Sequence, residues 1–212
     1  MTQATMVFVD GTNVLAELPK RLDCKKAKKR DELELLKIGL EVVNAWRIAS
    51  NLISLARINW FGSCVGNDEQ RAKHRQAIRS AGFEPFIFPR KPSGKEKGVD
   101  IALTRLMLVH AFQRNMGQAV LASGDEDYVE LVDEVKRYGC QVTGAFYLDH
   151  GFSRELRMRV DVERELVPNH VLTDHPNWKT RVDATVLRDD PSTPCPTCGA
   201  PMPAAGAAGE LS

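Results

Sequence analysis

The stretch Ala119–Tyr128, AVLASGDEDY, is a short apolar run that breaks at a Ser-Gly pair and then presents Asp125 and Asp127. A helical spacing of apolar residues begins at its end, so the pattern predicts a buried strand that runs into a turn and then a helix. The N-terminal segment has the same form, because the run MVFV at residues 6–9 leads directly into Asp10. Two strand ends that each carry an acid repel one another, and a divalent cation is the usual reason for them to lie together.

The length and composition fit one domain with a sizeable core. The chain has 212 residues, 43% of them hydrophobic, and its formal net charge is only +1. The global charge therefore gives no argument for a nucleic-acid partner, and such an argument has to come from local clusters. The five cysteines are odd in number and irregularly spaced, which favours reduced thiols. No signal peptide or membrane-spanning pattern is present, so we expect a cytoplasmic protein without a membrane partner.

Apolar runs and helical spacings alternate along most of the chain. Strands are predicted at residues 5–9, 52–61, 83–88, 119–122 and 140–148, and helices at residues 31–49, 67–81, 99–112 and 127–138. Residues 153–166 fit either a short helix or an edge strand. This alternation predicts βαβ units, in which a mostly parallel sheet is covered by helices on both faces. Ligands of such sheets bind beyond the carboxyl ends of the strands, where the strand order reverses, and we expect Asp10 and Asp125 to flank that crevice.

Acidic residues at strand-to-helix junctions are the candidates for chemistry. They are Asp10, Asp100, Asp125 and Asp127, with Asn13 and Ser123 as polar neighbours. Carboxylate oxygens in this number suit Mg²⁺ or Mn²⁺, which bridge protein carboxylates to phosphate oxygens. Such a site fits phosphodiester hydrolysis. Each acid alone also fits a helix cap or a turn, but capping does not require an acid at several junctions of one sheet.

Three segments occur in order along the chain: FVDGTN at residues 8–13, KGVD at residues 97–100 and SGDEDY at residues 123–128. They resemble the motifs of the NYN domain, a branch of the PIN-like ribonuclease superfamily. The resemblance covers residues 6–166 and implies a PIN-like three-layer α/β/α sandwich, with a five-stranded sheet in the order 3-2-1-4-5. Three ordered motifs are more specific than any one of them.

The same resemblance implies an activity and a site. The activity is metal-dependent cleavage of RNA phosphodiester bonds by a ribonuclease. The implied catalytic and metal-binding residues, for Mg²⁺ or Mn²⁺, are Asp10, Asp100, Asp125 and Asp127, and the supporting residues are Asn13, Ser123 and Lys97. No histidine falls in the motifs, so the metal rather than a side chain is expected to activate water.

Two basic clusters, within residues 20–30 and 90–97, predict sequence-independent contacts with RNA phosphates. The predicted RNA-binding residues are Lys25, Lys26, Lys28, Lys29, Arg30, Arg90, Lys91 and Lys95. A solvated charge run is the alternative explanation for either cluster alone.

A C-terminal extension at residues 168–212 is expected to follow a nuclease domain at residues 1–167, and its last part is predicted to be disordered. Cys195 and Cys198 form a CxxC pair, which is half of a zinc ribbon. Because Zn²⁺ needs four ligands, a zinc site here would require either His170 and His175 to complete it or two chains to share it as a homodimer.

Two other functions fit the same acidic crevice. The first is a non-catalytic RNA- or protein-binding module with a structural cation. The second is a small-molecule phosphatase or 5′-nucleotidase. The phosphatase is disfavoured because an aspartyl-phosphate enzyme needs a DxDxT loop, and Thr12 stands where the second Asp belongs.

Overall fold

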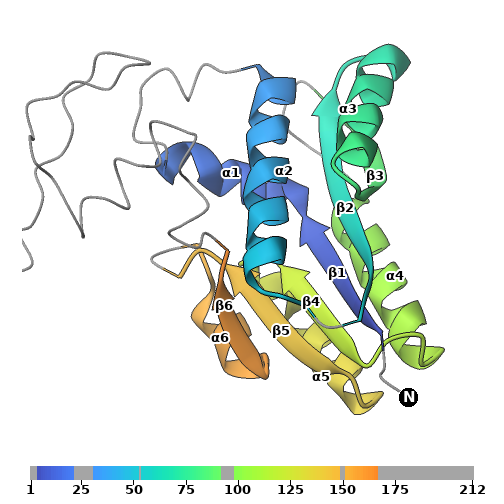
Figure 1. Cartoon of the computed structure of the whole chain (residues 1–212), viewed down its shortest axis with the longest axis vertical. Coiled ribbons are helices and arrows are strands. Elements are labelled where there is room, and N and C mark those ends of the chain that lie inside the picture. Colours follow the sequence, from blue (N-terminus) through green and yellow to red (C-terminus); the bar gives the residue numbers. More distant parts are fainter. Residues whose placement is uncertain (1–3, 22–30, 53, 92–97, 149–150, 167–212) are drawn as a thin grey trace, which may run out of the picture.

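A computed structural model describes residues 4–21, 31–52, 54–91, 98–148 and 151–166 of the chain. A six-stranded sheet in the order β3-β2-β1-β4-β5-β6 forms its centre, and every neighbouring pair of strands is parallel (Figure 1). The strands are β1 (Thr5–Asp10), β2 (Leu55–Val65), β3 (Glu84–Arg90), β4 (Gln118–Ala122), β5 (Gln141–Phe146) and β6 (Val162–Glu165).

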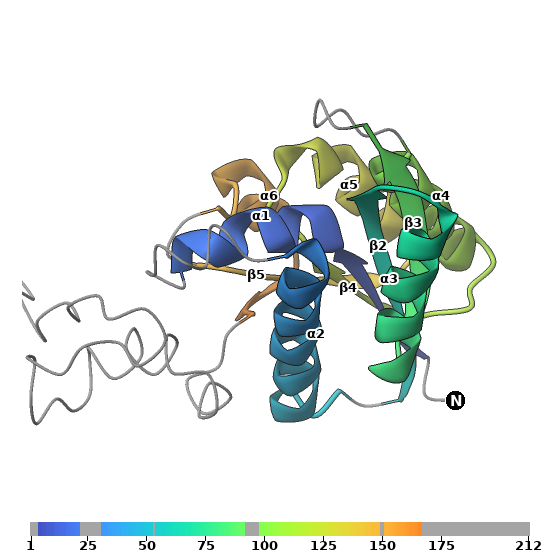
Figure 2. The ribbon, with the colours of Figure 1, turned by 90° about the horizontal axis from the view of Figure 1, so that it is seen from above.

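Helices cover both faces of the sheet, so the expected three-layer α/β/α sandwich is confirmed. They are α1 (Gly11–Arg21), α2 (Glu32–Ala49), α3 (Asp68–Ser80), α4 (Val99–Phe112), α5 (Val129–Arg137), α6 (Arg154–Arg159) and the 3₁₀ turn η2 (Glu126–Tyr128). Viewed from above, α2 and α3 lie on one side of the sheet and α4, α5 and α6 on the other (Figure 2). No helix in the described ranges has the length and apolarity needed to cross a bilayer.

The sheet has one strand more than predicted. The order 3-2-1-4-5 is confirmed for the first five strands, and β6 adds a parallel edge to β5, with Thr143 beside Val162. Residues 153–166 thus form both alternatives, the short helix α6 and then an edge strand. None of the side chains of β6 is buried, and its sequence, VERE, has no apolar alternation. Hydrophobic patterning therefore could not decide between a strand and a helix here.

Helix α1 was not predicted, because the residues after Asp10 were interpreted as a turn followed by a basic cluster. Gly, Thr and Asn at its start and Pro19 within it are poor helix formers. Packing outweighs this weak propensity, since Val14 and Leu18, one turn apart, are fully buried. Helix α1 continues directly from β1 and packs against β2 and α2.

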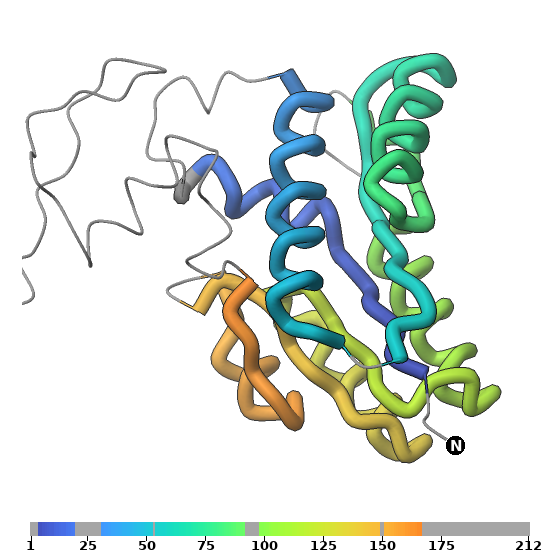
Figure 3. Tube along the Cα trace, viewed as in Figure 1, coloured from blue at the N-terminus to red at the C-terminus, as the bar shows by residue number. Residues whose placement is uncertain are grey.

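Strand β1 is central and buried at all six positions. The chain adds β2 and β3 on one side of it and then returns to place β4, β5 and β6 on the other side (Figure 3). The order of strand addition therefore reverses between β1 and β4, which is where ligands of parallel sheets bind. This arrangement brings Asp10, the last residue of β1, close to Ser123, the first residue after β4.

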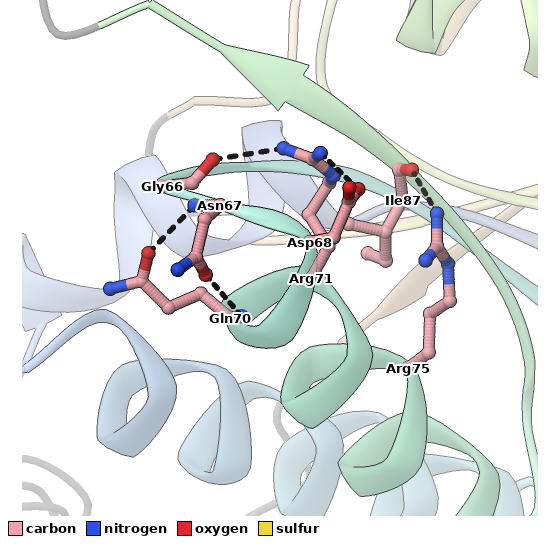
Figure 4. Close-up of polar contacts among 7 residues, drawn as sticks. All are labelled: Gly66, Asn67, Asp68, Gln70, Arg71, Arg75 and Ile87. Carbon is pink, nitrogen blue, oxygen red and sulfur yellow. Dashed lines mark hydrogen bonds and ion pairs between the residues drawn. The ribbon is translucent and has the colours of Figure 1, made fainter.

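Helix α3 is fixed at both its start and its side (Figure 4). Asn67 and Gln70 form a reciprocal capping box, and Arg71 donates a hydrogen bond to the carbonyl of Gly66 at 2.9 Å. Further along the helix, Arg75 donates to the carbonyl of Ile87 in β3 at 3.3 Å. These contacts set the position of α3 relative to the carboxyl ends of β2 and β3.

Candidate active site

Asp10, at the carboxyl end of the central strand, is only 3% exposed. Its Oδ1 accepts a hydrogen bond from the backbone N–H of Asn13 at 3.0 Å. Its Oδ2 lies 3.3 Å from the Ser123 hydroxyl and 3.2 Å from the Tyr128 hydroxyl. A buried carboxylate is costly unless donors surround it, and these donors also fix its orientation.

A second set of contacts joins the ends of β1 and β4. The side-chain oxygen of Asn13 accepts a hydrogen bond from the backbone N–H of Gly124 at 3.0 Å. Only glycine fits here, because a Cβ on Gly124 would lie 1.8 Å from the carbonyl oxygen of Gly151. The supporting roles expected for Asn13 and Ser123 therefore have a physical basis, since both connect the two strand ends.

Asp125 and Asp127 lie in the turn that follows. Asp125 caps η2, because its Oδ1 accepts a hydrogen bond from the backbone N–H of Asp127 at 3.1 Å. Asp127 is exposed. The turn directs the next residue, Tyr128, inward, where it is 2% exposed.

Tyr128 is the site residue that the sequence did not reveal. Its hydroxyl lies 3.2 Å from Asp10 Oδ2 and 3.1 Å from Asp100 Oδ1. Burial raises the pKa of Tyr128 far above its ordinary value, and the charges of Asp10 and Asp100 raise it further. The phenol therefore stays protonated and acts as a donor. Tyr128 is the last residue of the SGDEDY segment, which could have marked it as a site residue, but it was interpreted only as the start of a helix.

Asp100 reaches Tyr128 from the first turn of α4. The helix begins after Gly98, whose φ of 104° lies in the left-handed region that favours glycine. An acid in the first turn is also favoured by the helix dipole. Asp100 is exposed, so the pair combines a buried carboxylate on β1 with one that faces solvent.

The structure thus brings Asp10 and Asp100 together through Tyr128, with Asn13 and Ser123 beside Asp10. Within the described ranges, no group of three or more His, Cys, Asp or Glu side chains is close enough to hold a metal without other ligands. Mg²⁺ typically uses one or two protein carboxylates and completes its shell with waters and substrate phosphate. The all-oxygen donors of Asp10 and Asp100 fit such an ion.

The predicted RNA-binding residues are only partly described. Arg90, at the end of β3, forms an ion pair with Glu32 at the start of α2, and both side chains are about one-third exposed. Lys91, the next residue, is exposed. The remaining predicted RNA-binding residues lie outside the described residues, namely Lys25, Lys26, Lys28, Lys29, Arg30 and Lys95. The same holds for the supporting residue Lys97, for the zinc candidates Cys195 and Cys198, and for the whole extension at 168–212.

Comparisons with known proteins identify the family and support the fold. Residues 4–165 match the family model of the NYN domain, and a comparison with curated proteins found no significant match. A solved protein of unknown function from Vibrio parahaemolyticus RIMD 2210633 is similar in structure, with a TM-score of 0.58 and 20% identity over 77% of this chain and 93% of that chain. At this identity the likeness shows the fold alone. The family match covers most of the sequence, and the chain belongs to the NYN domain family, a nuclease-related family with the PIN-like fold.

Proposed function

We propose that this protein is a ribonuclease that hydrolyses RNA phosphodiester bonds with Mg²⁺ or Mn²⁺ held by Asp10 and Asp100, with Asp125 and Asp127 contributing from the adjoining turn when substrate and ion are bound. The observation that carries the proposal is the pairing of buried Asp10 with Asp100 through Tyr128, at the crevice where strand order reverses. Two carboxylates so close together repel one another. Membership of a nuclease-related family supports a cation as the group that offsets this repulsion, with a phosphodiester as the substrate that the cation binds.

The side chains have distinct roles in this proposal. Asp10 and Asp100 hold the ion, which when bound lowers the pKa of a water and stabilises charge on phosphate oxygens. The backbone N–H of Asn13 and the hydroxyl of Ser123 keep the Asp10 carboxylate in one orientation. Tyr128 positions both acids and, being protonated, is not the general base.

Asp125 and Asp127 lie in the turn after β4, and we propose that they approach the crevice from there. The cap that Asp125 forms with the Asp127 N–H holds this turn in place, so Asp125 combines a structural role with a proposed ligand role. Asp127 is exposed and is proposed to approach a substrate or an ion from the solvent side. The basic clusters near residues 20–30 and 90–97 are proposed to neutralise RNA phosphates around this crevice.

The test compares wild type with Asp100→Asn and with the matched control Glu84→Gln. Asp100 and Glu84 are both exposed, but Glu84 is the first residue of β3 and so lies at the amino ends of the strands, away from the carboxyl ends where the site lies. Each protein is incubated with labelled RNA, labelled DNA and a chromogenic phosphate ester, first with Mn²⁺ and then with EDTA.

We expect wild type and Glu84→Gln to cleave RNA only in the presence of Mn²⁺, and Asp100→Asn to be inactive. RNA binding without cleavage would indicate the non-catalytic module instead. Turnover of the ester without RNA cleavage would indicate a phosphatase.

A further inference from the structure

The edge strand β3 and the helix α3 that packs against it carry a row of basic side chains. Arg71, Arg75 and Arg79 follow one another at intervals of four residues, so they lie on one side of α3. Arg90 is the last residue of β3, and Lys91 follows it. We call these five residues the α3–β3 basic surface. It begins at the carboxyl ends of the strands, where the candidate active site lies, and continues along α3 toward their amino ends.

Two of these arginines are held in place by backbone carbonyl groups. Arg71 donates a hydrogen bond to the carbonyl oxygen of Gly66 at 2.9 Å, and Arg75 donates to that of Ile87 at 3.3 Å (Figure 4). A carbonyl group is neutral, so these bonds orient the guanidinium groups without cancelling their charge. Each guanidinium group has five N–H donors, and the bond to Ile87 therefore leaves Arg75 with donors for a ligand.

The cations of this surface outnumber the acids that pair with them. Arg71 pairs with Asp68, whose side chain is 96% exposed, and Arg90 pairs with Glu32. The cations of the surface that form no ion pair with any described residue are Arg75, Arg79 and Lys91. These three charges are available to an anionic ligand.

Cys64, the residue before the last of β2, is affected by several of these charges at once. Burial and the charge of Glu32 raise the pKa of its thiol, whereas Arg71, Arg90 and Arg75 each act to lower it. Because electrostatic interactions weaken with distance, the three guanidinium groups lie around the same strand end. The basic side chains of α3 are thus close to the edge of the sheet that holds the candidate active site.

A hollow of about 530 Å³ lies on the outer side of α3. The described residues that line it are Ala72, Arg75, Gln76, Arg79 and Ser80. No acid is among them. Arginine, glutamine and serine side chains commonly donate to phosphate and sugar oxygens of nucleic acids. The hollow therefore presents donors and positive charge to a phosphate group.

The outer edge of β3 is poorly suited to pairing with a strand from another protein. β3 is the last strand of the sheet on this side, and such an edge is normally open to an added strand. However, the Ile87 carbonyl already accepts from Arg75. Pro85 and Pro89, two residues away on either side, have no N–H to donate. An added strand is therefore disfavoured, and the basic side chains along this edge stay accessible.

We propose that the α3–β3 basic surface is a binding track for the part of the RNA strand that extends beyond the active site. The inference rests on the proposed ribonuclease function. The strand passes from the crevice at Asp10 across the carboxyl ends of β2 and β3 and then along the outer side of α3. Lys91, Arg75 and Arg79 bind its phosphates. Such contacts do not depend on base sequence, so the track adds affinity and no base preference.

The first experiment measures RNA binding in EDTA, where metal-dependent cleavage does not occur. Fluorescence anisotropy is recorded at several salt concentrations with an RNA of about 16 nucleotides, the upper end of site sizes for one single-strand-binding fold. The test variant carries Arg75→Gln and Arg79→Gln. The control variant carries Arg57→Gln and Arg105→Gln, which remove two charges from exposed arginines near the amino end of β2 and on α4.

We expect the test variant to bind this RNA about tenfold more weakly than wild type at ~0.15 M salt. The slope of log affinity against log salt should decrease in magnitude by about 1.4, because each contact with a single-strand phosphate contributes about 0.7. The control variant should keep the wild-type slope. An unchanged slope in the test variant, or an equal decrease in the control variant, would overturn the proposal.

Single substitutions separate RNA binding from folding. Arg79 is exposed and forms no ion pair with a described residue, so Arg79→Gln should leave α3 intact and lower the slope by about 0.7. Arg75→Lys keeps the charge and should retain most of the affinity that Arg75→Gln loses. If Arg75→Lys binds as weakly as Arg75→Gln, Arg75 holds the edge strand only and is not a phosphate ligand.

The second experiment compares cleavage of the same RNA with cleavage of a short RNA of about 4 nucleotides in Mn²⁺. We expect the test variant to raise KM for the long RNA with kcat unchanged, and to cleave the short RNA as wild type does, because a short strand in the crevice does not reach α3. An equal loss with both RNAs would contradict a track beyond the active site.

The two experiments distinguish the track from the proposed function. If wild type binds RNA but does not cleave it, the proposed function fails and the salt slope still decides whether the track exists. A wild-type oligomer that the test variant dissociates in sedimentation, with RNA affinity unchanged, would identify a protein interface instead and overturn the proposal.

Discussion

The hydroxyl of Tyr128 lies 3.1 Å from Oδ1 of Asp100 and also contacts Asp10. The hydroxyl therefore lies between two acids that reach the site from different elements, the start of α4 and the end of β1, and can donate its hydrogen to either of them. Because Tyr128 is buried behind them, it acts on the separation and orientation of the carboxylates and remains inaccessible to a substrate. Its predicted effect is on ion binding.

Replacing Tyr128 with Phe should weaken Mn²⁺ binding about 10–100-fold, as expected for a residue that orients a ligand. The ring remains packed, so we expect the free energy of unfolding to fall by only about 1 kcal/mol, for the lost hydrogen bond. Calorimetric Mn²⁺ titration and urea unfolding measure the two quantities. Tyr138→Phe is the matched control, because Tyr138 is 40% exposed at the end of α5. Unchanged Mn²⁺ affinity in Tyr128→Phe would contradict the bridging role.

The pKa of Tyr128 leads to a separate prediction at high pH. Burial, followed by the charges of Asp10 and Asp100, raises it in the folded state, whereas an unfolded tyrosine ionises near pH ~10. The stability that Tyr128 contributes is therefore fully present below pH ~10 and is lost as pH rises further. Phenolate absorbance recorded between pH ~9 and ~11 on folded protein should be identical for wild type and Tyr128→Phe. A smaller signal in the variant would show that Tyr128 ionises normally.

The sequence predicted the central strands because they are buried on both faces and form uninterrupted apolar runs. Helix α4 was predicted with its observed bounds, Val99–Phe112, since a glycine precedes it and an apolar spacing continues through it. Helix α1 was not predicted, and an edge strand was only one of two alternatives for residues 153–166, because tertiary contacts hold α1 and β6 against weak local preferences. Leu18 in α1 is fully buried, and α1 packs against β2 and α2.

The candidate site was predictable where acids occur together at several strand-to-helix junctions of one sheet. Asp10 and Asp100 stood out as acids at junctions, and the structure brings them together. Tyr128 could not be identified in this way, because an aromatic residue at a helical spacing is usually core. Its hydroxyl gains a role only through the fold, which brings β1 and α4 to it.

Asp100 allows a test of ion binding that does not depend on catalysis. A ligand that binds only the folded state increases the free energy of unfolding, by about 2.7 kcal/mol at a concentration 100-fold above its dissociation constant. It therefore also raises the melting temperature. We expect millimolar Mn²⁺ to raise the melting temperature of wild type and of Glu84→Gln, and EDTA to reverse the effect. Asp100→Asn should show little increase, although its melting temperature in EDTA should be close to that of wild type because Asp100 is exposed. An equal increase in Asp100→Asn would exclude Asp100 as a ligand.

Asp161 attaches the added edge strand to the rest of the sheet. Its Oδ2 accepts a hydrogen bond from the Val142 N–H at 2.7 Å, and its Oδ1 pairs with Lys136 Nζ at 2.7 Å. Burial acts to raise the pKa of Asp161, but the Lys136 and Val142 contacts together lower it. The stabilisation is therefore present above the unfolded pKa of about 3.9 and is lost as pH falls below it.

We accordingly expect Asp161→Asn to cost about 0.5–1 kcal/mol at pH ~7, a value reduced for solvent screening. The difference from wild type should shrink below pH ~4. Urea unfolding at several pH values measures it, with Glu84→Gln as the control. A constant difference across this range would show that the carboxylate charge has no role at the edge.

Gly11 gives a prediction in which two effects have opposite signs. It follows Asp10 and is the first residue of α1, where helix propensity alone predicts that alanine would stabilise the protein by about 0.5–1 kcal/mol. However, a Cβ at this position would lie 2.3 Å from Trp60 Nε1 and 2.7 Å from the Phe61 carbonyl oxygen. Because Trp60 is 1% exposed and the second contact is backbone, neither neighbour can move easily. We therefore expect Gly11→Ala to destabilise the protein by about 1–3 kcal/mol in urea unfolding.

Gly11→Ala should also lower Mn²⁺ affinity, because the displaced start of α1 carries the Asn13 N–H that holds Asp10. A stabilised variant would mean that α1 can shift away from β2 at little cost, and that Asp10 is not held by this close approach.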